Sequence, residues 1–315
     1  MSAPDTVTRR VVDVDGVPMS ALIAPVADPR AIVIAIHGGS MTSAYFDCPG
    51  QPRLSLLRLG ARLGFTVVAL DRPGFGSSAP FADRMAEPAR RVDLAYAAFD
   101  AVLGSAPRGA GVFLLAHSNG CELALRMAVC QRGRDLLGIE ISGTGRRHQP
   151  AARDILSQAE IRDIRRGVRE LLWRPPHLYP AGVIGGVGPA AGSPAYDGAV
   201  VRNWPQRDFP TLAAQLRVPV RFSLADHEYV WESAPAGLTE VAAMFTASPR
   251  VVVNEQRDSG HNLSLGLTAP AYHLGVLSFV EECATAAERR GHSAHGRDDG
   301  RPAGGTHDSV DSEAC

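Results

Sequence analysis

The sequence contains no lysine: all 32 of its basic residues are arginine. A site that depends on a lysine amine is therefore excluded, which removes Schiff-base enzymes, P-loop nucleotide sites and protein kinases. An excess of positive charge is also missing, because 33 acidic residues leave a net charge of −1. Proteins that bind nucleic acid usually carry a basic excess, so we expect no nucleic-acid partner.

Long apolar runs and paired cysteines are absent as well. The longest clean apolar run, residues 31–36, is far shorter than the ~18 residues that a membrane helix requires. The first 25 residues carry five charged side chains and no apolar stretch, so no signal peptide is predicted. The five cysteines form no C-x-x-C pair, which argues against a zinc site and a disulfide framework. We therefore expect a cytoplasmic protein with reduced thiols, no metal, no cofactor and no membrane contact.

The chain alternates short apolar runs with amphipathic segments. Residues 6–25 predict a β-hairpin that turns at Asp15-Gly16. Apolar runs without polar alternation then predict strands buried on both faces at 31–36, 65–70, 111–116, 137–141, 218–224 and 251–254. Helices are predicted at 53–63, 84–103, 120–132, 235–247 and 270–287. This alternation predicts an α/β fold with a mixed, mostly parallel, doubly wound sheet.

One connection is far longer than the ~2–6 residues usual in such folds, namely residues 145–210. Residues 154–173 are predicted to be helical, and residues 174–194 are too rich in proline and glycine for regular structure. Because the segment carries Trp173, Tyr179 and Trp204, it is too apolar for a disordered linker. We interpret it as a helical and irregular lid, and expect these three aromatic residues to contact the substrate.

The lid interrupts the predicted domain. We assign residues 1–144 and 211–288 to one α/β core, with the lid inserted between them. Residues 289–315 are polar, glycine-rich and almost without apolar side chains, and are predicted to form a disordered tail.

Ser118 lies between a predicted strand and a predicted helix, in the pentapeptide A-H-S-N-G. A serine in such a sharp turn, with small residues two positions away, is typical of a nucleophile elbow. The strained backbone exposes the hydroxyl, and the helix N-terminus favours developing negative charge. Ala116 replaces the first glycine of the usual G-x-S-x-G pattern. On the pentapeptide alone, a serine N-cap in an ordinary turn is an equal alternative.

Two further motifs make the chain resemble the α/β-hydrolase fold family over residues 8–285. H-G-G-S at residues 37–40 follows the third predicted strand, where the family has its oxyanion loop. D-R-P-G-F-G-S-S at residues 71–78 follows the fourth and matches the family's D-x-x-G-x-G-x-S turn. We expect Asp71 to fix this turn and to take no direct part in catalysis.

The resemblance implies a catalytic triad in the chain order nucleophile, acid, histidine. Ser118 is the expected nucleophile. Asp226 follows a predicted strand at the position of the family's acid, with Glu228 as the competing carboxylate. His261, in S-G-H-N before the final helix, is the expected base.

The resemblance also implies an oxyanion hole built from backbone N–H groups. The expected donors are Asn119, which follows the nucleophile, and Gly39, with Ser40 as a substitute.

These residues predict a cofactor-independent serine hydrolase acting on an ester or thioester of a bulky hydrophobic acyl group. A serine at the elbow argues against an epoxide hydrolase or a dehalogenase, and the absence of lysine excludes the lysine-dependent hydroxynitrile lyases. Residues 145–209 carry ten arginines against six acidic residues, which would suit a CoA- or carrier-protein-linked substrate or only a solvated face. Two alternatives stay open: cyclisation, acyl transfer or lyase chemistry in secondary metabolism, and a non-catalytic ligand-binding receptor.

Overall fold

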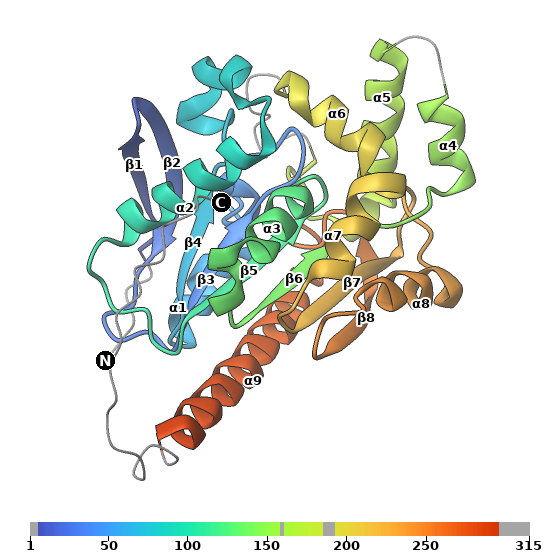
Figure 1. The fold of residues 1–315 in the computed structure, drawn as a ribbon. Helices are drawn as coiled ribbons and strands as arrows, with labels where there is room; N and C mark the ends of the chain where they lie inside the picture. The colour runs from blue at the N-terminus through green and yellow to red at the C-terminus, as the bar shows by residue number, and fades with distance from the viewer. Residues whose placement is uncertain (1–5, 158–160, 185–192, 296–315) are drawn as a thin grey trace.

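The computed structural model describes residues 6–157, 161–184 and 193–295. Its centre is an eight-stranded sheet of order β1-β2-β4-β3-β5-β6-β7-β8 (Figure 1). The strands are β1 (Thr8–Val14), β2 (Val17–Ala24), β3 (Ile32–Ile36), β4 (Thr66–Leu70), β5 (Val112–His117), β6 (Gly138–Ser142), β7 (Val220–His227) and β8 (Val251–Gly260). β2 pairs antiparallel with β1 and β4, and all other neighbours are parallel. The predicted mixed, mostly parallel sheet is confirmed.

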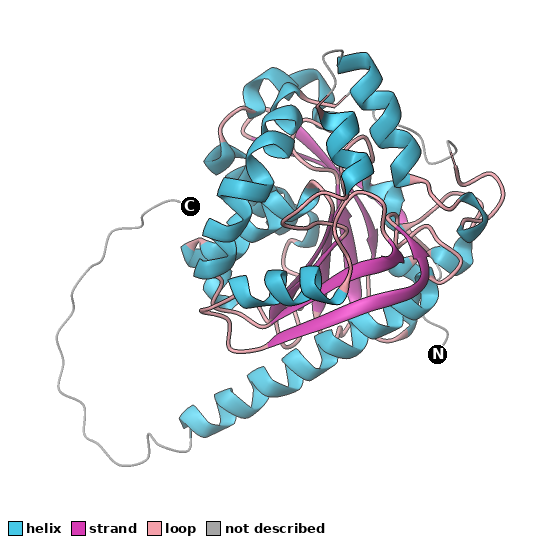
Figure 2. Cartoon of the chain, turned by 90° about the vertical axis from the view of Figure 1, so that its right-hand side faces the viewer, coloured by secondary structure: helices cyan, strands magenta, loops and turns pink. Residues whose placement is uncertain are grey.

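Helices cover both faces of this sheet (Figure 2). They are α1 (Leu56–Arg62), α2 (Pro88–Leu103), α3 (Gly120–Val129), α4 (Pro150–Leu156), α5 (Ile161–Leu172), α6 (Ala195–Asn203), α7 (Phe209–Gln215), α8 (Pro235–Met244) and α9 (Ala269–His295). α1 and α9 pack on one face, whereas α2, α3, α7 and α8 pack on the other. The doubly wound arrangement is therefore also confirmed.

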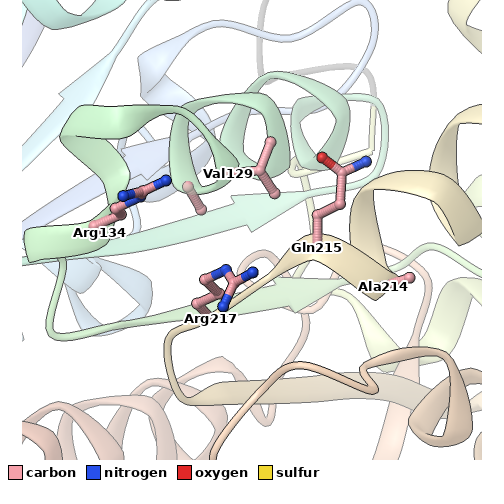
Figure 3. Close-up of a pocket in the computed structure, with 6 residues that line it drawn as sticks. Val129, Arg134, Ala214, Gln215 and Arg217 are labelled. Carbon is pink, nitrogen blue, oxygen red and sulfur yellow. The ribbon is translucent and has the colours of Figure 1, made fainter.

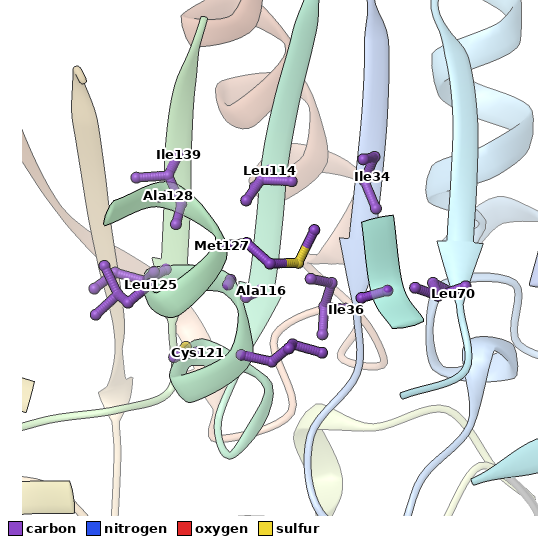
Figure 4. Close-up of a cluster of buried hydrophobic side chains, with 14 of the residues drawn as sticks. Ile34, Ile36, Leu70, Leu114, Ala116, Cys121, Leu125, Met127, Ala128 and Ile139 are labelled. Carbon is purple, nitrogen blue, oxygen red and sulfur yellow. The ribbon is translucent and has the colours of Figure 1, made fainter. Parts of the chain in front are cut away.

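Side chains of a central strand alternate between the two cores. On β3, Ile32, Ile34 and Ile36 pack among residues of α2, α3 and α7, whereas Val33 and Ala35 pack among residues of α1 and α9. Figure 4 shows part of the first of these cores, where side chains of α3 pack over β5 and β6, beside Ile34 and Ile36 of β3. Because both faces are buried, neither can be polar, which explains the continuous apolar run in the sequence.

The long connection between β6 and β7 contains α4 to α7 and a π-helical turn, Trp204–Asp208. α4, α5 and α6 gather beyond one end of the sheet (Figure 1). α7 instead packs against α3 on a face of the sheet, so the insertion returns to the core close to the predicted boundary at residue 210. That the insertion acts as a lid stays a prediction.

The C-terminal helix extends further than predicted. α9 ends at His295, so the expectation of a disordered tail from residue 289 is wrong for its first seven residues. A polar, arginine-rich composition does not prevent helix formation when a long helix is already anchored, because each added residue gains a backbone hydrogen bond. The remainder of the predicted tail, 296–315, lies outside the described residues. None of the described helices combines the length and apolarity needed to cross a bilayer.

Candidate active site

Ser118 occupies a strained turn between β5 and α3. Its φ of 51° lies in the left-handed region, which costs a non-glycine residue about 1–3 kcal/mol. An added Cβ on Gly120 would lie 2.4 Å from the carbonyl oxygen of His37, so only glycine allows α3 to cross β3 this closely. Ala116 is fully buried and fits without difficulty in place of the usual glycine. The geometry is that of the predicted elbow, and Ser118 is half-buried at its tip.

His261 lies beside this turn although it is far away in sequence. It follows β8, is buried, and packs edge-on against the ring of His117 with a centroid separation of 4.9 Å. An added Cβ on Gly143, which follows β6 with a φ of 60°, would lie 2.4 Å from Cε1 of His117 and 3.3 Å from Cε1 of His261. A glycine at the end of β6 therefore makes room for both imidazoles, a requirement that we did not infer from the sequence.

The carboxylate that holds His261 is Glu228, not Asp226 as predicted. The Glu228 oxygens lie 2.9 and 3.1 Å from Nδ1 of His261, and Glu228 is 3% exposed. Nε2 of His261 is buried and has no hydrogen-bond partner among the described residues. Because Glu228 accepts at Nδ1, the ring proton lies on that nitrogen, and the lone pair of Nε2 can accept a proton from a nucleophile.

Asp226 has a different task at the end of the sheet. Its carboxylate accepts hydrogen bonds from the backbone N–H groups of Asp258 (2.9 Å) and Ser259 (3.1 Å), which ties β7 to β8. The error has a physical cause: β7 continues to His227, three residues beyond the predicted end, with a register irregularity between Ala225 and His227. Asp226 is therefore still part of the strand, and Glu228 is the first residue after it.

Residues 37–40 form a loop against the elbow, here called the oxyanion loop. An added Cβ on Gly38 would lie 3.0 Å from Cβ of Ser118, and one on Gly39 would lie 3.0 Å from Nδ2 of Asn119. The two glycines therefore let backbone approach the nucleophile closely. Ser40 has a φ of 55° and lies further along the loop. The donor roles of Gly39, Asn119 and Ser40 stay predictions.

His37 is buried inside this loop in its neutral form. Its Nε2 accepts a hydrogen bond from the backbone N–H of Arg72 (3.0 Å), so Nδ1 carries the proton and donates it to the carbonyl oxygen of Gly38 (2.8 Å). Burial, and then the charge of Arg72, lower the pKa of His37 well below its usual value. His37 therefore orients the loop and is not a second base.

Asp71 fixes the D-x-x-G-x-G-x-S turn as predicted. It accepts hydrogen bonds from Ser20 Oγ (2.5 Å) and from the backbone N–H of Ser43 (2.6 Å). Ser20 Oγ in turn accepts from the N–H of Ser77 within the turn (2.9 Å). The carboxylate is therefore engaged in structure and not directed toward a substrate.

The three aromatic residues of the insertion are held by contacts within the protein. Trp204 donates to Thr144 Oγ1 (2.6 Å) and stacks on Phe209. The Tyr179 hydroxyl accepts from the N–H of Asn262 (3.2 Å), next to His261, and its ring meets Trp173 edge-on. Contact of Trp173, Tyr179 and Trp204 with a substrate stays a prediction.

Other candidate sites contribute little. Among the residues that the structure describes, no three His, Cys, Asp or Glu side chains are grouped so that they could hold a metal ion. A hollow of about 250 Å³ lies between the ends of α3 and α7 and is lined by Arg134, Gln215 and Arg217 among others (Figure 3). It contains none of the site residues described above. The glycine-rich G-G-V-G of residues 185–188 has no preceding apolar run typical of a buried strand, which argues against a dinucleotide site, and it lies outside the described residues.

Comparison with known proteins agrees with the fold. A model of the alpha/beta hydrolase family matches residues 33–272, so the chain belongs to that family. The family assignment supports the predicted hydrolase. A comparison with curated proteins gives no match.

Solved structures resemble the chain at low identity. A membrane phospholipase A, described as a bacterial virulence factor, superposes with a TM-score of 0.64 at 17% identity, covering 89% of this chain and 87% of the other. A carboxyl esterase from Bacillus coagulans gives 0.63 at 16%, covering 88% and 99%. The thioesterase domain of the curacin biosynthetic pathway gives 0.57 at 16%, covering 86% and 99%. At these identities the likeness shows the fold alone.

Proposed function

We propose that this protein is a serine hydrolase that cleaves an ester or thioester through an acyl-enzyme, with Ser118, His261 and Glu228 as its triad. The observation that supports it most is the arrangement of His261. Nδ1 is held by a buried carboxylate, while Nε2 has no partner among the described residues and the ring lies beside the serine elbow. Buried His117 and His273 also each have one ring nitrogen without a partner among the described residues, so the support lies in the combination at His261 of a buried carboxylate on Nδ1, an unpartnered Nε2 and a position beside the elbow.

The proposed reaction proceeds in two halves. Oγ of Ser118 attacks the carbonyl carbon of the substrate while Nε2 of His261 takes the proton of the Ser118 hydroxyl. Glu228 stabilises the resulting imidazolium. The tetrahedral oxyanion accepts hydrogen bonds from the N–H groups of Asn119 and Gly39. Collapse expels the alcohol or thiol, which takes the proton from His261. A water activated by the same imidazole then hydrolyses the acyl-enzyme and restores Ser118.

The proposed substrate carries a bulky hydrophobic acyl group. The support is the apolar character of the insertion around Trp173 and Trp204. Solved structures described as a lipase, a carboxyl esterase and a thioesterase domain share the fold. A panel of p-nitrophenyl esters and acyl-CoAs of increasing chain length would separate esterase from thioesterase activity and locate the preferred length.

Labelling with a fluorophosphonate probe tests the proposal. The wild type should form a covalent adduct that Ser118→Ala does not, because only an activated serine attacks the probe phosphorus. An unlabelled wild type would contradict the nucleophile and favour a binding role. A wild type that labels but hydrolyses no ester or thioester would favour cyclisation or acyl transfer to another acceptor.

A further inference from the structure

A buried ion pair joins the insertion to the core next to the oxyanion loop. Nη1 and Nη2 of Arg72, which follows β4, lie 2.8 and 3.1 Å from the two carboxylate oxygens of Asp197 on α6. The two side chains are 1% and 6% exposed, and Arg72 also lies over the ring of Phe75. The partners are 125 residues apart in sequence. This bidentate geometry fixes the guanidinium plane as well as its position.

The fixed guanidinium also holds the oxyanion loop. Nη2 of Arg72 donates to the carbonyl oxygen of Gly38 (3.1 Å), the same oxygen that accepts from His37 Nδ1. In a trans peptide the C=O and the following N–H point in opposite directions. Two donors on the Gly38 oxygen therefore direct the N–H of Gly39 away from Arg72. The same loop lies against the elbow, because an added Cβ on Gly38 would lie 3.0 Å from Cβ of Ser118.

Neighbouring contacts attach the same part of the insertion to the same loops. Ser193 Oγ lies 2.9 Å from Ser40 Oγ, and the Tyr196 hydroxyl donates to the carbonyl oxygen of Pro73 (2.7 Å). An added Cβ on Gly39 would lie 3.6 Å from Oδ2 of Asp197. The start of α6 thus lies directly against the oxyanion loop.

We infer that Asp197 is a positioning residue for the oxyanion hole and acts through Arg72 on the Gly38–Gly39 peptide. The inference rests on the proposed function, because it assigns the Gly39 N–H to the transition-state oxyanion. The hydrogen bond from the Gly39 N–H to the substrate oxygen becomes strong only as negative charge develops on that oxygen. A misoriented N–H therefore lowers kcat and leaves substrate binding nearly unchanged.

Asp197→Asn tests the inference, with Asp208→Asn as the matched control. Asp208 also lies in the insertion and forms ion pairs with Arg126 of α3 and with Arg207, away from the oxyanion loop. Asp197→Asn should lower kcat for a short p-nitrophenyl ester by about 10- to 100-fold, a fraction of the ~10²–10³ that losing a whole donor costs, with KM changed by less than about twofold. Asp208→Asn should keep kcat within about twofold of the wild type.

A second variant covers the case in which Asp197→Asn does not fold. The double variant Arg72→Met, Asp197→Leu leaves no unpaired charge in the interior, so it avoids the main cost of breaking a buried pair. It also removes the guanidinium donor to Gly38, and should show the same selective loss of kcat.

Hydrogen exchange separates this inference from the proposed function, because it needs no turnover. Amides of residues 38–41 should exchange faster in Asp197→Asn than in Asp208→Asn. Equal exchange in the two variants overturns the inference, as does selective exchange with an unchanged kcat in an enzyme that cleaves esters. Selective exchange in a protein that cleaves neither esters nor thioesters would uphold the structural link and overturn the proposed function instead.

Discussion

Replacing Glu228 with glutamine should disable the proposed triad while keeping the shape of the site. The carboxylate lies 2.9 and 3.1 Å from Nδ1 of His261 and, as a pure acceptor, keeps the ring proton on that nitrogen. The amide of glutamine can donate to Nδ1 instead, which moves the proton to Nε2 and blocks transfer from Ser118. The equivalent loss of tautomer in a serine protease costs about 10⁴ in kcat, so we expect a loss of about 10³- to 10⁴-fold.

Asp226→Asn provides the matched control, because it makes the same change in a carboxylate two residues away. The carboxylate oxygens of Asp226 accept hydrogen bonds from the backbone N–H groups of Asp258 and Ser259. One amide oxygen can still accept, so we expect kcat within about threefold of the wild type. The loss of a charge-assisted hydrogen bond should lower the free energy of unfolding by about 1–2 kcal/mol.

The assay is release of p-nitrophenolate from p-nitrophenyl butyrate, with urea denaturation of each variant as the measure of folding. The expected pattern is a catalytic defect without a stability defect at Glu228, and the reverse at Asp226. If Asp226→Asn lost about 10³-fold activity while Glu228→Gln stayed within tenfold, the acid would be Asp226 and the reasoning from the His261 contacts would be refuted.

Two further predictions concern buried imidazoles and the space around them. Burial lowers the pKa of His273 to about 3 in the folded protein. In the unfolded chain this imidazole has its ordinary pKa of ~6.5, so as pH falls the unfolded chain takes up a proton here before the folded protein does. The contribution of neutral His273 to the free energy of unfolding is therefore fully present above pH ~6.5, and it is lost between pH ~6.5 and pH ~3 at about 1.4 kcal/mol per pH unit. His273→Gln should reduce the difference in unfolding free energy between pH 7 and pH 5 by about 2 kcal/mol in urea titrations, and an unchanged difference would contradict this assignment. Gly143→Ala should lower kcat/KM about 100-fold, because the added methyl displaces His117 and His261. Gly16→Ala, at a φ of 72° with open space around it, should cost about 1 kcal/mol of stability and no activity; equal kinetic effects of the two glycine variants would contradict a steric origin.

The sheet and the elbow could be predicted because their signals are local. Buried strands such as β3 and β5 read as continuous apolar runs, and the strand–turn–helix order around Ser118 lies within a few residues. The acid could not be assigned in this way. The end of β7 depends on its pairing with β8 across an irregular register, and this pairing brings Glu228 to His261.

Contacts between the insertion and the core could not be predicted either, because they too depend on tertiary structure. Nothing near Arg72 in the sequence identifies Asp197 as its partner. No sequence pattern around Gly143 indicates that two imidazoles pack over this glycine. The aromatic side chains of the insertion were visible as apolar residues. That Trp204 and Tyr179 donate and accept hydrogen bonds within the protein depends on tertiary structure.

The strand order has a consequence for how activity is acquired. Ser118 follows β5 in the interior of the sheet, whereas His261 follows β8, its last strand in both sequence and space. His261, the proposed base, can therefore lie beside Ser118 only when β8 is paired with β7 at the edge of the sheet. Recovery of enzymatic turnover during refolding should accordingly report completion of the sheet up to this edge strand.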